Sequence, residues 1–114
     1  PFEVQMFPKR GISRLPELSA PEKLEFATMY LSILQALDRV LGVEMPYIAA
    51  WHQAPVHAHD DDSRLFLEVV SLRRAAGKLK YLAGSESAAG VWINDISPEA
   101  AAQALREELK QVSA

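Results

Sequence analysis

Residues 19–42 read SAPEKLEFATMYLSILQALDRVLG, the longest regular pattern in the chain. The pattern opens with Ser19 and, three residues later, Glu22. This is a capping box, because the serine hydroxyl accepts a backbone N–H of the first turn while the carboxylate reaches back to the N–H of the serine. Gly42 closes the pattern, since glycine readily adopts the left-handed conformation that ends a helix. We therefore predict a helix over residues 20–41, about six turns long.

This helix carries a broad apolar stripe that needs a surface to cover. Residues at steps of three and four define the stripe, and further apolar residues lie alongside it. The first group is Leu24, Ala27, Leu31, Leu34 and Leu41; the second is Phe26, Tyr30, Ile33, Leu37 and Val40. A stripe of this width is typical of a helix that packs on a β-sheet.

Short apolar segments supply the strands of that sheet. Residues 2–7 alternate between apolar and polar until Phe7, and residues 8–18 read as a loop. Three further strands are predicted at 47–51, 65–70 and 78–83, and the short connections between them favour antiparallel pairing. Ser97 and Pro98 then open a second helix with Leu105 and Leu109 on its inner face. The predicted fold class is α+β, an antiparallel sheet with one long helix packed on it and a C-terminal helix.

Size and composition indicate one domain, residues 1–114. The chain has 114 residues, of which 49% are hydrophobic, and this is enough for a single core. Its formal net charge of −3 gives no general attraction to nucleic acid or to an anionic membrane. It contains no cysteine, no apolar run of membrane-spanning length and no signal-peptide pattern, which is compatible with the cytoplasm. Because it starts directly in a strand-like segment, we expect it to be part of a longer protein.

All three histidines fall within eight residues, at His52, His57 and His59, and three aspartates follow at 60–62. Neutral imidazole is a common ligand of zinc and iron, so the cluster could contact a metal ion. An Asp-rich run does not read as a strand, however. A solvated polar loop is the simpler interpretation, and we favour it.

Two other segments could bind a ligand. Arg73, Arg74, Lys78 and Lys80 concentrate positive charge in an acidic chain, which suits either a phosphate site or a solvated strand end. Residues 84–90 are small and flexible, but they lack the Gly-Lys-Ser/Thr ending of a P-loop. We interpret Trp51 and Trp92 as core or interface anchors in preference to stacking platforms for a ligand. These residues do not form a complete catalytic constellation.

Several separated strings nevertheless resemble one family. They are Pro1-Phe2-Glu3, Pro8-Lys9, Pro46-Tyr47, Trp51-His52-Gln53-Ala54-Pro55, KLKYLAGSE at 78–86 and INDISPE at 93–99. In this order they resemble the C-terminal half of galactose-1-phosphate uridylyltransferase, and the resemblance covers nearly the whole chain.

The resemblance implies a fold, a reaction and partners. Such enzymes consist of two histidine-triad-like halves and exchange UMP between UDP-glucose and galactose 1-phosphate through a uridylyl-histidine. That histidine belongs to a His-Pro-His motif of the N-terminal half, and this sequence contains no such motif. The chain is therefore expected to hold no catalytic residue and to be inactive alone, because the nucleophile is missing. The implied partners are the N-terminal half with its zinc, UDP-glucose or UDP-galactose, a hexose 1-phosphate, and a second copy of the enzyme in a cytoplasmic homodimer.

The resemblance also implies a metal position at His52. This residue matches a family histidine that binds a second, structural metal, which is iron in some members, and the other ligands from this half form a His-x-His on the next strand. Counting back from Glu68 and Arg73 places those two ligands at Arg64 and Phe66, neither of which replaces imidazole. A second register would use His57 and His59 instead. We prefer the first register because residues 64–70 read as a strand.

The substrate contacts implied by the resemblance are Lys80 and Glu86, which would reach the hexose phosphate and the sugar hydroxyls across a dimer interface. Ser85 stands where many members carry tyrosine, and Asn94 is a weaker candidate nearby. Two rival hypotheses remain. One is a non-catalytic histidine-triad-like module that binds nucleotide sugar or dimerises. The other is a metal-binding domain built on His52, His57 and His59.

Overall fold

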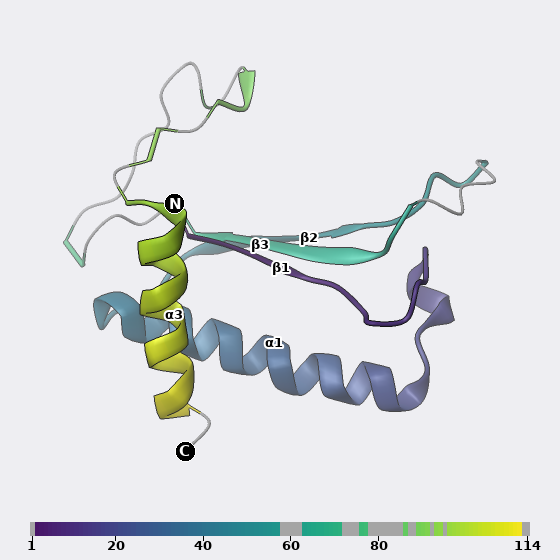
Figure 1. Cartoon of the computed structure of the whole chain (residues 1–114), viewed down its shortest axis with the longest axis horizontal. Helices are drawn as coiled ribbons and strands as arrows, with labels where there is room; N and C mark the ends of the chain where they lie inside the picture. The colour runs from purple at the N-terminus through teal and green to yellow at the C-terminus, as the bar shows by residue number, and fades with distance from the viewer. Residues whose placement is uncertain are drawn as a thin grey trace.

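The computed structural model of the chain describes residues 2–57, 63–71, 76–77, 86, 89–91, 93–94 and 96–112. The elements follow in the order β1 (Phe2–Met6), a 3-10 turn η1 (Leu15–Glu17), α1 (Ala20–Leu41), β2 (Tyr47–His52), β3 (Phe66–Ser71) and α3 (Pro98–Val112). The three strands form an antiparallel sheet in the order β1–β3–β2. Both helices lie on one side of it (Figure 1). The predicted α+β class is therefore confirmed, while the strand predicted at 78–83 lies outside the described residues.

Both ends of α1 are fixed by the local signals that predict them. The Ser19 Oγ accepts the N–H of Glu22 at 3.3 Å, and the Ser19 N–H donates to the Glu22 carboxylate at 2.8 Å. Gly42 has φ of 68°, the left-handed conformation that lets the helix end there. Since these signals depend only on nearby residues, the predicted bounds of this helix agree with the observed ones.

The inner face of α1 differs from the predicted stripe. Leu24 and Leu31 are 71% and 57% exposed, so the first half of that stripe, Ala27 included, points away from the core. The residues that pack on the core are mostly those lying alongside the stripe: Phe26, Tyr30, Ile33, Leu37 and Val40, with Leu34 and Leu41. The reason is that the row alongside the stripe includes Phe26, which reaches the sheet. The ring of Phe26 lies 4.9 Å from that of Trp51 on β2.

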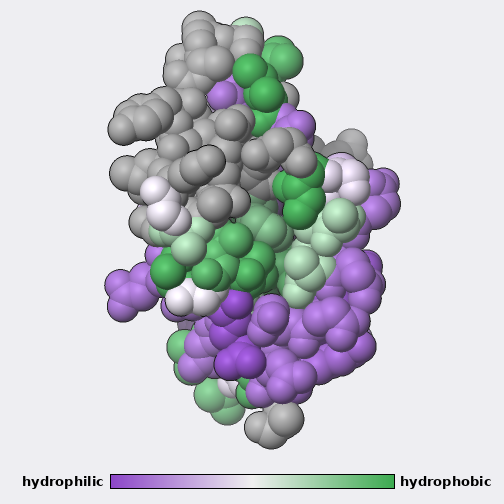
Figure 2. Space-filling view, turned by 90° about the vertical axis from the view of Figure 1, so that its left-hand side faces the viewer, coloured by the Kyte–Doolittle hydropathy of each residue, from purple (hydrophilic) through white to green (hydrophobic). Residues whose placement is uncertain are grey.

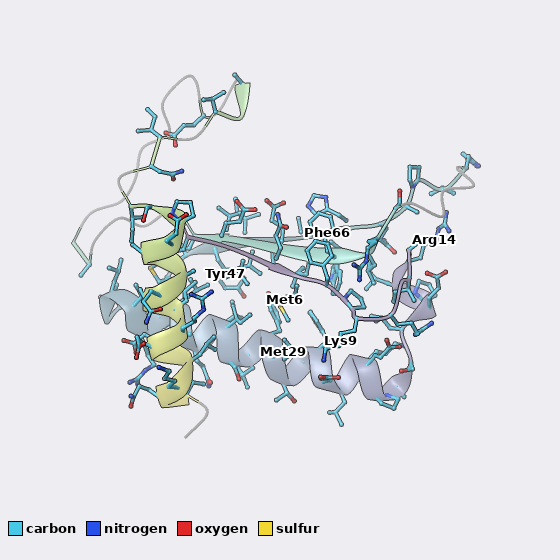
Figure 3. The ribbon with its side chains drawn as sticks, in the orientation of Figure 1. Met6, Lys9, Arg14, Met29, Tyr47 and Phe66 are labelled. Carbon is cyan, nitrogen blue, oxygen red and sulfur yellow. The ribbon has the colours of Figure 1, made fainter. Side chains whose placement is uncertain are left out.

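The core lies between the helices and one face of the sheet. β1 contributes Phe2 and Met6, and β3 contributes Leu67 and Val69. Figure 3 shows Met6 directed from β1 toward α1. The helices complete this core with Ala36, Leu37, Ala101 and Leu105. Strand residues on this face alternate with residues on the other, as the pleat of a strand requires.

Helix α3 starts and packs as predicted. Its first turn is capped by Ser97, whose Oγ accepts the N–H of Ala100 at 3.2 Å, and both Leu105 and Leu109 face the core. An ion pair of 3.0 Å between Arg39 and Glu108 joins α1 to α3. The side of the molecule that carries α3 is largely hydrophilic in its lower half (Figure 2).

The connection between β1 and α1 is hydrogen-bonded to the residues just after β2 and just before β3. The N–H of Leu65 donates to the Ile12 carbonyl at 2.8 Å, and the N–H of Ala54 donates to the Ser13 carbonyl at 3.0 Å. Ile12, Ala54 and Leu65 are all buried. This attachment brings the segment after β1 next to the start of β3.

Across the described part of the chain, no helix has the length and apolar character needed to cross a membrane.

Candidate functional site

The face of the sheet opposite the helices carries the polar side chains. The strand register places His52 beside Phe66, and it places Glu68 between Ala50 on β2 and Gln5 on β1. Because neighbouring residues across an antiparallel pair lie on the same face, these side chains form one surface. We call it the outer face of the sheet.

His52 is held by two contacts on the outer face. Its Nε2 lies 2.8 Å from a carboxylate oxygen of Glu68, and its ring stacks on Phe66 with the centroids 4.4 Å apart and the planes at 9°. The imidazole therefore has its orientation fixed from β3 on two sides. Part of both the histidine and the glutamate side chain remains accessible to solvent.

Phe66 is also contacted on its other side. The ring of Phe7, just after β1, stacks on it at 4.8 Å between centroids. The Arg64 guanidinium lies over the Phe7 ring at 5.5 Å and donates to the Pro8 carbonyl. Three rings and one cation thus line up along this end of the sheet.

These residues do not fit the metal that the resemblance implies at His52. A structural metal site is built from several nitrogen, oxygen or sulfur ligands. The two positions implied as further ligands hold a phenyl ring and a guanidinium, and neither donates a lone pair. In the described part of the chain, no group of three or more His, Cys, Asp or Glu side chains is placed to hold an ion. His57 lies exposed in the turn after β2, and His59 is outside the described residues.

Two of the four predicted substrate-binding residues are described. Glu86 is only 4% exposed, and its carboxylate accepts the N–H of Ile93 at 3.2 Å. The Glu86 carbonyl accepts the N–H of Gly90, whose φ of 65° allows the chain to turn back. Asn94 follows directly and is exposed. These contacts bring Glu86 close to Asn94, while Lys80 and Ser85 lie outside the described residues.

Asn94 lines a cavity of about 560 Å³ beside β1, which we call the β1 cavity. Its apolar wall comes from α1 and α3, and its polar groups are Glu3, Gln5, Glu68, Asn94 and Arg106. Glu68 belongs both to this lining and to the His52 pair, so the cavity and the outer face are continuous. Carboxylates, amides and a guanidinium can together accept hydrogen bonds from hydroxyl groups and donate hydrogen bonds to them.

Sequence reasoning did not find the contributions of Glu68 and Arg106 to this site. Glu68 is the charged residue within the apolar run of β3, and that charge is the available signal. Arg106 offered none, because a charged residue on a helix usually faces solvent, and only the packing of α3 beside β1 brings it to the cavity.

A second cavity, of about 480 Å³, lies between α1 and the loop after β1. Phe26, Met29 and Trp51 form apolar parts of its wall, and Lys9 extends from the loop toward α1 (Figure 3). Trp51 also packs against the core, in agreement with its interpretation as an anchor. Trp92 lies outside the described residues.

Residues 1–114 match the family model described as "Galactose-1-phosphate uridyl transferase, C-terminal domain". Similar curated proteins include galactose-1-phosphate uridylyltransferases from three organisms. The protein of Thermotoga maritima is 37% identical over 110 residues, which is 94% of this chain and 34% of that protein. The Streptomyces lividans protein is 35% identical over 94% of this chain and 33% of its own length. The Rattus norvegicus protein is 32% identical over 93% of this chain and 29% of its own length.

The fold is also similar to that of a solved structure titled "Structure of uridylyltransferase". The TM-score is 0.89 at 37% identity, over 97% of this chain and 35% of that one. The chain thus spans about a third of the length of the relatives it matches.

Proposed function

Because the chain belongs to the family of galactose-1-phosphate uridylyltransferase C-terminal domains, we propose that it serves as that domain in an enzyme exchanging UMP between UDP-glucose and galactose 1-phosphate. The observation that carries this proposal is the match along all of residues 1–114, together with the shared fold. Since the chain spans only about a third of its relatives, the reaction is proposed for the chain together with the remaining part of the enzyme.

In this proposal the work is divided between the two parts. The nucleophilic histidine comes from the N-terminal part, and this chain supplies contacts to the sugar phosphate through Lys80, Ser85, Glu86 and Asn94. An ammonium group attracts a phosphate, and a carboxylate accepts hydrogen bonds from sugar hydroxyls, so charged groups give the strongest of these contacts. The contact between Glu86 and the N–H of Ile93 supports this role, because it holds the carboxylate in a fixed place next to Asn94.

The proposed partners follow from the same family. They are the N-terminal part of the enzyme and a second copy, assembled so that Lys80 and Glu86 reach the site of the neighbouring subunit, and the location is the cytoplasm.

A chimeric enzyme tests the proposed function. This chain replaces the C-terminal third of the T. maritima relative, and transfer is measured as formation of UDP-galactose from UDP-glucose and galactose 1-phosphate. We expect transfer by the chimera and none by the N-terminal two thirds of the relative alone. A chimera that is folded by circular dichroism and yet inactive would rule out the proposal.

Variants of the chimera test the site residues. Lys80→Ala and Glu86→Gln should each lower kcat/KM about 10- to 100-fold, as expected for loss of a charged hydrogen bond to the substrate. The matched control is Glu107→Gln, which changes an exposed carboxylate on α3 and should leave kcat/KM unchanged. Unchanged kinetics in both site variants would refute the assignment while leaving the function of the domain intact.

A further inference from the structure

β2 ends and β3 begins at one end of the outer face. The side chains there are not those of a metal site. We propose that this chain binds no transition metal at His52, because Arg64 and Phe66 occupy the places of the missing ligands and a stack of three rings joins the strands there instead. We call Phe7, Phe66 and His52 the ring stack. The proposal concerns metal content and stability, so it stands or fails separately from uridylyl transfer.

The register makes Phe66 the direct neighbour of His52. The two residues are paired across β2 and β3, and their rings lie 4.4 Å apart and nearly parallel. An imidazole at position 66 would therefore stand within reach of a metal bound to His52, and a phenyl ring at that position fills the space without offering a ligand atom. The position that decides between binding and exclusion thus carries an aromatic hydrocarbon.

Arg64 supplies no ligand atom either. Its guanidinium lies over Phe7, the ring that stacks on Phe66, and a guanidinium has N–H donors but no lone pair to give a metal. The ligand position held by Arg64 therefore cannot support binding.

The two remaining candidate ligands, His52 and Glu68, are already bonded to each other. His52 Nε2 and a Glu68 oxygen are 2.8 Å apart, so the pair is satisfied as a hydrogen bond without an ion. Even if both turned to a metal, they would supply two side chains, fewer than a structural site uses.

The ring stack replaces what a metal would do mechanically. Phe7 follows β1, Phe66 begins β3 and His52 ends β2, so the two ring contacts of 4.8 and 4.4 Å connect all three strands. Offset and parallel rings at such distances attract each other beyond the area they bury. The stack explains how this corner of the sheet keeps its geometry without coordination.

Metal content in purified chains tests the proposal. The wild-type chain, the His52→Gln variant and the double variant Arg64→His with Phe66→His are each loaded with Zn²⁺ or, without oxygen, with Fe²⁺, then freed of excess ion and analysed by mass spectrometry. We expect no metal that depends on His52 in the wild type. The double variant should retain about one ion per chain, because His52, Glu68 and the two new imidazoles form a set of four ligands.

Two outcomes would overturn the proposal. One is an ion retained by the wild type and lost in His52→Gln; the variant His57→Ala with His59→Ala is the control that identifies metal held elsewhere. The other is a double variant that is folded and binds no ion, since Arg64 and Phe66 would then not be what excludes it. Thermal unfolding gives an independent readout. EDTA should leave the melting temperature of the wild type unchanged and lower that of the metal-loaded double variant.

Discussion

The carboxylate of Glu22 illustrates how much one side chain does at the start of α1. It accepts hydrogen bonds from the Arg10 guanidinium and from the N–H of Ser19, both at 2.8 Å. These contacts lower the pKa of Glu22 from 4.5 to about 2. The Arg10 guanidinium is the largest cause of this shift, and the backbone N–H and hydroxyl of Ser19 contribute further. The loop after β1 and the helix are thereby joined through an ionised group.

This lowered pKa predicts a pH dependence of stability. Because the folded state holds the pKa of Glu22 below its unfolded value, the ionised carboxylate stabilises the fold above about pH 4.5. That contribution is lost as the pH falls from 4.5 through 2. Urea unfolding of the wild type and of Glu22→Gln should therefore differ most near neutral pH, and the difference should shrink below pH 4.5. Glu25→Gln, an exposed carboxylate one turn into the helix, serves as the control. A difference that is constant down to about pH 2.5 would contradict this account.

At the scale of elements, α1 separates what short-range signals specify from what packing specifies. The bounds of the helix follow from Ser19, Glu22 and Gly42, which act within a turn of themselves, so the sequence alone predicts them. The buried face does not follow, because apolar residues cover more than half of the circumference and two neighbouring rows compete. Packing on the rest of the fold selects one of them, and the contact between Phe26 and Trp51 on β2 is part of that packing.

A pair of leucine variants tests which row of α1 is buried. Leu37→Ala removes a side chain that is 2% exposed and leaves a cavity, so the free energy of unfolding should fall by about 2–5 kcal/mol. Leu31→Ala makes the same chemical change on the outer row and should cost about 0.5 kcal/mol or less in the isolated chain. Denaturant unfolding monitored by circular dichroism measures both. Equal losses would mean that the helix packs in a different rotation.

Only those parts of the candidate site that a local stretch of sequence specifies could be predicted. The Trp-His-Gln-Ala-Pro string located His52, and the strand reading of residues 64–70 agrees with the start of β3 at Phe66, beside that histidine. By contrast, Glu68 and Arg106 join the β1 cavity from β3 and α3, and no local pattern specifies how these elements meet. The stack of Phe7 on Phe66 likewise depends on the loop after β1 returning to Leu65 and Ala54.

At the scale of the whole molecule, one cluster of buried residues connects the helices and strands that the structure describes. Phe2 from β1, Leu37 from α1, Leu67 from β3 and Leu105 from α3 belong to one cluster. Because the described helices and strands share this cluster, each depends on the others for the burial of its apolar side chains. We therefore expect one cooperative unfolding transition.

A Leu105→Ala variant tests this cooperativity. The substitution weakens the core from α3 and should lower the melting temperature of the entire fold, not only of that helix. Two probes follow it: far-ultraviolet circular dichroism for the helices and, in a Trp92→Phe background, the fluorescence of Trp51 for β2. The two transitions should coincide in both proteins. If the circular dichroism changes well before the fluorescence in the variant, α3 unfolds as a separate unit.

The position of β3 between β1 and β2 also has a kinetic consequence. Its pairing with β2 joins segments separated by the 13 residues 53–65, whereas its pairing with β1 joins Phe2 to Ser71 and Met6 to Leu67, more than 60 positions apart. Closing so long a loop costs chain entropy before any contact compensates for it, and such non-local pairings slow folding. The helix with its two caps depends mainly on local contacts. We therefore expect the pairing of Phe2–Met6 with β3 to be the step that limits the folding rate.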